Sequence, residues 1–137
     1  MFLDFDSLPK YQQNGAFISL GPKVTGTPLE SRAVMHNVVK GFSFHPIVTN
    51  SPRQFSWLGL VHGLFRGKHF FRFEYSDELK GETVLTHGEA FSGLLGWMAG
   101  TGWLASRLGF EAGIKRGLVE LEAFNRDFKG WCEKWEQ

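Results

Sequence analysis

Two polar side chains interrupt an apolar run in the second half of the chain. His87 and Glu89 are two residues apart in a segment of strand-like composition, and alternation along a strand directs both to one face, which Leu85 and Phe91 share. A carboxyl group held among apolar side chains can act as a general acid, with a nearby imidazole as its partner or as an independent base. The same pair could also be structural, hydrogen-bonded to the backbone.

Two further polar residues fall on surfaces that are otherwise apolar. Asn125 interrupts the apolar stripe of a C-terminal segment, where a buried amide needs a ligand oxygen, a backbone carbonyl or a water as its partner. His69 shares its strand face with aromatic residues, either as a cap on a cavity or as a core histidine. We take Glu89, His87 and Asn125 as candidate catalytic residues. The candidate substrate-binding residues are Phe44, Trp57, His69, Phe71, Phe73, Leu85, Phe91 and Leu121.

The other chemistry-bearing residues lack the spacings that metals, nucleotides or covalent catalysis require. His36, His45 and His62 show no metal-ligand spacing, and Cys132 is the single cysteine, which excludes a disulfide framework and a multi-cysteine zinc site. No dinucleotide-binding, P-loop or Gly-x-Ser-x-Gly motif is present. We therefore expect no metal and no cofactor, although facing strands could still bring histidines together in space.

Length and composition indicate one domain covering residues 1–137. Apolar residues make up 42% of the chain and aromatic residues 15%, which is ample for a core. The formal net charge of +1 argues against nucleic-acid binding. The N-terminus has no signal-peptide pattern, so we expect a cytoplasmic protein.

The uncharged stretch between Glu89 and Arg107 is rich in glycine and poor in Leu, Ile and Val. A membrane-spanning helix needs about 20 mainly apolar residues, so we expect no stable membrane insertion. Residues 93–103 are instead expected to form a flexible gate over a cavity.

The patterns along the chain predict a β-meander followed by one long helix. A short helix is expected at residues 4–11, interrupted by Pro9, and a short extended piece at 17–20. Five runs of strand length are separated by short turns and so predict antiparallel neighbours: residues 31–39, 42–49, 54–61, 68–76 and 82–91.

From residue 108 to residue 135, apolar residues recur at steps of three and four, which predicts an amphipathic helix. Its stripe should face the sheet through Phe110, Ile114, Leu118, Leu121 and Phe128. A helix of about 26 residues is about 39 Å long and can cross a whole sheet. We therefore expect an α+β fold in which a curved antiparallel β-sheet wraps around a long C-terminal α-helix.

Several segments within residues 40–135 carry a family resemblance: Phe44-His45-Pro46-Ile47-Val48 and residues 55–59, 63–71, 89–95 and 109–112. They resemble the SRPBCC superfamily, which includes START-like and polyketide cyclase-like proteins. The resemblance implies the helix-grip fold and a ligand cavity between sheet and helix. Residues 11–17 depart from the family pattern, and this chain lacks the first edge strand with which proteins of the family usually begin. An exposed sheet edge could then pair with a second copy, so a homodimer is possible.

The resemblance and the aromatic strand faces together suggest a function. We expect the protein to bind a bulky apolar small molecule and to catalyse its cofactor-independent cyclisation, pericyclic (Diels–Alder-like) or polyketide cyclase-like, in natural-product biosynthesis. The cavity would hold the substrate in a reactive conformation, while Glu89, His87 or Asn125 polarises a carbonyl or moves a proton. The alternatives are a non-catalytic lipid or hydrophobic-ligand carrier and a partner-binding module that uses the sheet edge.

Overall fold

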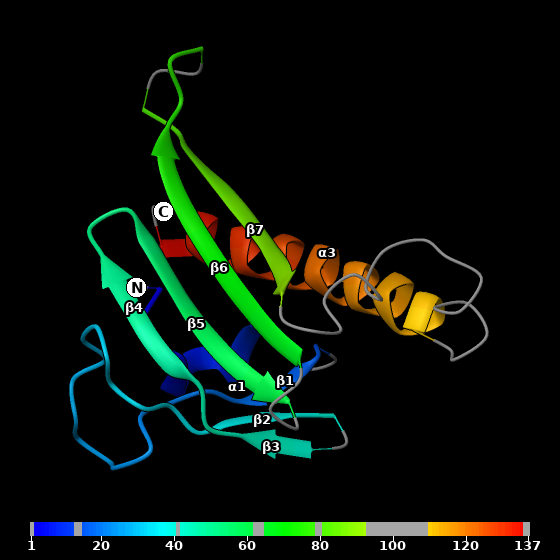
Figure 1. Ribbon diagram of the computed structural model, residues 1–137. Helices are drawn as coiled ribbons and strands as arrows, with labels where there is room; N and C mark the ends of the chain where they lie inside the picture. Colours follow the sequence, from blue (N-terminus) through cyan, green and yellow to red (C-terminus); the bar gives the residue numbers. More distant parts are fainter. Residues whose placement is uncertain are drawn as a thin grey trace.

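The computed structural model describes residues 2–12, 15–40, 42–61, 65–78, 81–92 and 110–135 and has an α+β fold (Figure 1). A 3-10 helix, η1 (Phe5–Ser7), continues into α1 (Leu8–Tyr11), and α3 (Phe110–Trp135) ends the described chain. The expected gate at residues 93–103 lies outside the described residues. The strands between the helices are β1 (Phe17–Ser19), β2 (Asn37–Val39), β3 (Phe42–Phe44), β4 (Ile47–Ser51), β5 (Gln54–Val61), β6 (Phe65–Tyr75) and β7 (Thr83–Ser92).

These strands form two antiparallel sheets. Strands β1, β2 and β3 make the smaller sheet, and β4, β5, β6 and β7 make the larger one, each with strands neighbouring in chain order. The antiparallel meander predicted from the turn residues is therefore confirmed for residues 54–61, 68–76 and 82–91. Short hairpin connections permit this order because antiparallel neighbours need no crossover.

The predicted strand at residues 42–49 is divided in the structure. Pro46 has no backbone N–H to donate to a strand ladder, and the chain changes sheets at this point. β3 ends at Phe44 and pairs with β2, whereas β4 begins at Ile47 and pairs with β5. The single strand expected here is therefore two strands in different sheets.

The predicted strand at residues 31–39 is also shorter than expected. Only Asn37–Val39 forms a named strand. The chain before this strand, at Arg32 and Ala33, forms backbone hydrogen bonds with β4 instead. Val48 N–H donates to the Ala33 carbonyl, and Arg32 N–H donates to the Val48 carbonyl, both at 2.8 Å. Arg32 has a φ of 77°, a left-handed conformation that interrupts an extended strand.

The inner face of the larger sheet is aromatic and its outer face carries charges, as alternation predicts. Phe55 and Trp57 on β5 and Phe71 on β6 are buried, whereas Arg72 and Glu74 on β6 are exposed. A large apolar side chain buried in this way contributes about 1.5–3 kcal/mol. This aromatic face packs against the helices, for example through the Phe71–Phe124 ring contact with α3.

Helix α3 has close to the predicted bounds but a different rotation. Figure 1 shows its C-terminal half against the larger sheet, whereas its N-terminal half extends past the ends of β6 and β7. Phe124 is 1% exposed and Phe128 is 7% exposed, while Leu118 is 56% exposed. The prediction that Leu118 faces the sheet is wrong, because the buried stripe centres on Phe124 and Phe128. The side chains of Phe110 and Ile114 lie outside the described residues.

Phe2 fills the interior between the sheet and α3. Its ring centroid lies 4.6 Å from that of Phe71, 4.9 Å from that of Phe73 and 5.6 Å from that of Phe128. Leu85 packs against the same core. This part of the space between sheet and helix is therefore filled by side chains, so any cavity must lie elsewhere.

Candidate functional site

A cavity of about 300 Å³ lies where both sheets meet the N-terminal half of α3. This volume is at the lower end of the range of about 300–1,000 Å³ that is usual for ligand pockets. The neighbouring strands β5, β6 and β7 of the larger sheet each contribute one inner-face side chain, namely Trp57, His69 and Glu89. The lining residues are Ala16, Phe17, Val39, Lys40, Phe44, Trp57, His69, Glu89, Arg116, Gly117, Glu120 and Leu121.

Two directly paired glycines leave room for aromatic rings on the larger sheet. Gly59 on β5 lies directly opposite Gly67 on β6. A Cβ atom at Gly59 would lie 3.5 Å from the Phe44 ring, and one at Gly67 would lie 3.6 Å from the Phe91 ring. The two phenylalanines therefore pack over positions that have no side chain, and Phe44 also lines the cavity.

A chain of four polar side chains runs from the cavity into the aromatic interior; we call it the polar chain. Glu89 Oε1 lies 2.8 Å from His69 Nδ1, His69 Nε2 lies 2.6 Å from His87 Nε2, and His87 Nδ1 lies 2.7 Å from Asn125 Oδ1. Strand register builds the first link, because His69 on β6 is the direct partner of Glu89 on β7. The last link reaches α3 and ties the helix to the sheet.

Aromatic rings hold the two imidazoles in place. The His69 ring is stacked on Trp57 with centroids 4.5 Å apart and an interplanar angle of 3°. The His87 ring is stacked on Phe71 with centroids 4.1 Å apart and meets the Phe124 ring edge-on at 5.1 Å. These contacts bury the His69 ring, partly shield the His87 ring from water and limit the rotation of both.

The hydrogen bonds determine which atoms of the polar chain carry protons. Burial lowers the pKa of His87 to about 3, the nearby His69 acts in the same direction, and the hydrogen bond to Asn125 opposes them. His87 is therefore neutral at pH 7. Because the Asn125 amide oxygen can only accept, His87 Nδ1 donates to it, and His87 Nε2 must accept from His69 Nε2.

This assignment leaves one proton between His69 Nδ1 and Glu89. In this hydrogen bond either His69 Nδ1 donates to a Glu89 carboxylate oxygen or a Glu89 hydroxyl donates to Nδ1. The His69 side chain is 4% exposed, whereas the Glu89 side chain is 41% exposed. Glu89 is thus the end of the polar chain that a molecule in the cavity can reach.

The structure brings the predicted catalytic residues together but gives them unequal access. Glu89 lines the cavity, whereas His87 and Asn125 do not and lie behind His69. Among the predicted binding residues, those that line the cavity are Phe44, Trp57, His69 and Leu121. Phe71, Phe73 and Leu85 belong to the packed interior, and Phe91 packs over Gly67.

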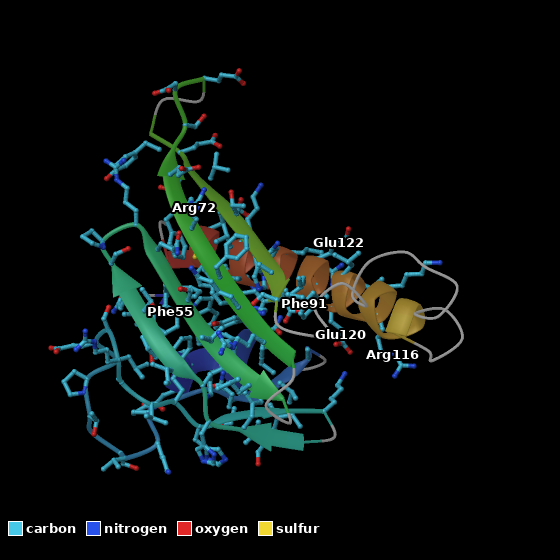
Figure 2. All side chains as sticks on the ribbon, in the orientation of Figure 1. Phe55, Arg72, Phe91, Arg116, Glu120 and Glu122 are labelled. Carbon is cyan, nitrogen blue, oxygen red and sulfur yellow. The ribbon has the colours of Figure 1, made fainter. Side chains whose placement is uncertain are left out.

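Sequence reasoning missed the charged residues of the cavity, which are Lys40, Arg116 and Glu120. Figure 2 shows Arg116 and Glu120 projecting from one side of α3 and Glu122 from the opposite side. Glu120 is adjacent to Leu121, which was already predicted to face inward, and Arg116 lies one turn before Glu120. Their helical positions are the signal that could have found them.

Within the described ranges, no group of three His, Cys, Asp or Glu side chains is arranged to hold a metal ion. In the polar chain the ring nitrogens of His69 and His87 face each other rather than a common point, so their lone pairs cannot converge on a metal. No helix in the described part of the chain is long and apolar enough to cross a membrane.

Comparison of the chain with protein-family models, with curated proteins and with solved structures gave no match. The resemblance to the SRPBCC superfamily therefore stays a prediction. The cavity and the polar chain are the observations that support a function.

Proposed function

We propose that the protein binds one compact, largely apolar small molecule in the cavity and catalyses its cofactor-independent cyclisation by proton transfer through Glu89. The observation that carries this proposal is the Glu89–His69 pair. Its carboxyl group is accessible from the cavity, and its imidazole is buried and bonded to it at 2.8 Å. A reactive group that is backed by a buried partner is typical of acid–base sites.

The pair can carry out an intramolecular aldol closure without consuming a proton. The Glu89 carboxylate removes a proton from the carbon next to a substrate carbonyl, and the resulting electron pair forms a C–C bond to a second carbonyl carbon. The π electrons of that carbonyl move to its oxygen, which takes the proton back from Glu89. A hydrogen bond from His69 Nδ1–H to the carboxylate, at 2.8 Å, orients Glu89 before and after the reaction.

The rest of the polar chain positions His69. Asn125 fixes the tautomer of His87, and the neutral His87 accepts a hydrogen bond from His69 Nε2–H. His69 is thereby held with its Nδ1 toward Glu89. His87 and Asn125 are positioning residues in this proposal, whereas Glu89 is the catalytic residue.

The cavity walls confine the substrate. Phe17, Phe44, Trp57 and Leu121 provide apolar surfaces, and such surfaces can hold a flexible molecule in one reactive conformation. A volume of about 300 Å³ favours a compact substrate over a bulky one. The antiparallel strands packed on a C-terminal helix support the helix-grip assignment, and we place the reaction in natural-product biosynthesis by that resemblance.

A second candidate is a non-catalytic carrier of a hydrophobic ligand. One observation favours it: every ring nitrogen of His69 and His87 already has a partner inside the protein. A fully satisfied polar network can serve stability alone.

Proton exchange on a probe ketone distinguishes the two candidates. We expect the protein to accelerate hydrogen–deuterium exchange next to the carbonyl of 2-tetralone, a compact aromatic ketone, followed by proton NMR in D₂O. Glu89→Gln should lower this rate by about 10²–10⁴-fold, the usual contribution of a general base. Glu122→Gln, at an exposed carboxylate on the opposite side of α3, is the control and should retain the rate. A carrier would bind the ketone without accelerating exchange in any variant.

A further inference from the structure

The outer face of the larger sheet carries a row of exposed aliphatic side chains that continues into the chain before β2. Val34 forms an antiparallel bridge with Ile47, and Ile47 lies directly opposite Leu58 on β5. Residues directly opposite each other share one face of a sheet, so these three side chains are neighbours. Leu60 lies two positions further along the same face of β5, and all four side chains are exposed. We call these four residues the aliphatic patch.

Basic residues flank the aliphatic patch on two sides. Lys23 N–H donates to the Val34 carbonyl at 2.9 Å, which places Lys23 beside Val34 at one end of the row. At the other end, Lys68 and Arg66 on β6 lie directly opposite the two leucines. The three basic side chains are exposed and take part in none of the ion pairs between described residues. The patch is therefore an apolar centre with positive charge on either side.

The outer face of the larger sheet has more basic than acidic residues. Its charged positions on β6 are Arg66, Lys68, Arg72 and Glu74, and Glu74 is the one furthest from the patch. On the described strands β4, β5 and β7 of this sheet, the outer-face positions hold no acidic residue. With every one of these side chains ionised, the face carries a net positive charge next to the patch.

These features favour an anionic lipid surface as the occupant. Two copies that met through this face would bring basic residues against basic residues, which opposes a dimer. Protein partners are usually anchored by tryptophan, tyrosine and arginine in pockets, with leucine and valine under-represented, whereas this patch is aliphatic and lies on an open sheet face. Aliphatic side chains can enter the boundary between headgroups and acyl chains of a bilayer, while nearby lysines and arginines attract anionic lipids.

We propose that this face of the larger sheet docks on an anionic lipid bilayer, with the aliphatic patch at the acyl boundary and Lys23, Arg66 and Lys68 at the headgroups. The protein then lies on the bilayer and does not cross it. The inference is independent of the proposed function, because none of these residues lines the cavity.

Sedimentation with lipid vesicles at 0.1 M salt tests the proposal. The unmodified protein should bind vesicles of phosphatidylcholine and phosphatidylserine (3:1) about tenfold or more strongly than vesicles of phosphatidylcholine alone. Lys68→Glu should lower binding to the mixed vesicles by about tenfold or more, whereas Lys129→Glu, the same charge change at an exposed site on α3, should lower it by less than about threefold. Leu60→Ser should lower it by about fivefold. Leu118→Ser is the matched control, since Leu118 is 56% exposed and Leu60 is 57% exposed, and it should leave binding unchanged.

Each contrary result would overturn the proposal. Equal binding to both kinds of vesicle would remove the preference for an anionic surface, and an equal loss in Lys68→Glu and Lys129→Glu would remove the assignment to this face. Unchanged binding of Leu60→Ser would show attraction by charge alone. Failure to bind either vesicle, together with binding of poly-L-glutamate in the same buffer, would make an acidic protein the partner instead. None of these outcomes bears on proton exchange at Glu89, which tests the proposed function separately.

Discussion

His87 should make the protein less stable as the pH falls below about 6.5. Burial among Phe71 and Phe124 and the neighbouring His69 lower the pKa of His87 from 6.5 to about 3. Between these two pH values the unfolded chain binds a proton at this residue and the folded chain does not. Stability therefore rises with pH across this window and is lost as the pH decreases.

The size of the effect follows from the width of the window. Each pH unit below 6.5 favours the unfolded state by about 1.4 kcal/mol for one such group. At pH 4.5, two units below the unfolded pKa of 6.5, the loss is about 3 kcal/mol. Domains of this size are stable by about 5–15 kcal/mol in total, so a loss of this size is readily measured.

Urea unfolding at pH 7.5, 6.5, 5.5 and 4.5 provides the assay, with His87→Gln as the key variant. A glutamine amide cannot titrate, but it can accept from His69 and donate to Asn125, so it retains both hydrogen bonds. The unmodified protein should lose about 3 kcal/mol more than His87→Gln between pH 7.5 and pH 4.5. His36→Gln, which removes an exposed imidazole, is the matched control and should follow the unmodified protein.

Two results would refute this reasoning. Parallel pH dependence in the unmodified protein and in His87→Gln would show that His87 does not titrate differently in the folded and unfolded states. A His87 ring proton whose NMR shift titrates near pH 6.5 in the folded protein would show that the imidazole is not desolvated.

Three further predictions concern packing and the cavity. Phe124→Ala should lower the free energy of unfolding by about 3–5 kcal/mol, whereas Leu118→Ala, at an exposed position, should change it by no more than about 0.5 kcal/mol in the same urea titrations. Gly117→Ala should stabilise the helix by up to about 1 kcal/mol, because a Cβ atom there meets nothing within 4 Å. Gly117→Phe should block binding of 2-tetralone, and Gly130→Phe on the same helix should not; equal binding by both would contradict the placement of the cavity.

The faces of the strands could be predicted from the sequence because the alternation is regular. His69, Phe71 and Phe73 share one face of β6, as expected, and His87 and Glu89 share one face of β7. The alternation within each strand does not specify the register between them, that is, which residue of β6 lies opposite which residue of β7. His69 was therefore expected to bind substrate, and its contact with Glu89 emerged only from the register.

The helix illustrates a second limit. Leu118, Leu121 and Phe128 form one possible stripe on α3, and Phe124 with Phe128 forms an overlapping one. Periodicity cannot choose between stripes that differ by a modest rotation. Packing against the rings of Phe17, Tyr11 and His87 selects the stripe that contains Phe124.

Residue type also cannot separate a packed core from a cavity wall. Phe71 and Trp57 are both buried aromatic residues on the inner face of the sheet. Phe71 is covered by Phe2, whereas Trp57 lines the cavity. The difference depends on Phe2, a residue almost 70 positions away in the chain.

The direct pairing of His69 with Glu89 across β6 and β7 restricts how this gene can change in length. An insertion or deletion of one residue between His69 and Tyr75, or between Thr83 and Glu89, shifts the register of the paired residues beyond it by one and turns their side chains to the other face. Such a change would separate the imidazole from the carboxylate in a single step, whereas substitutions would weaken the site gradually. Between His69 and Glu89, length variation that preserves the pair is confined to the connection between Tyr75 and Thr83.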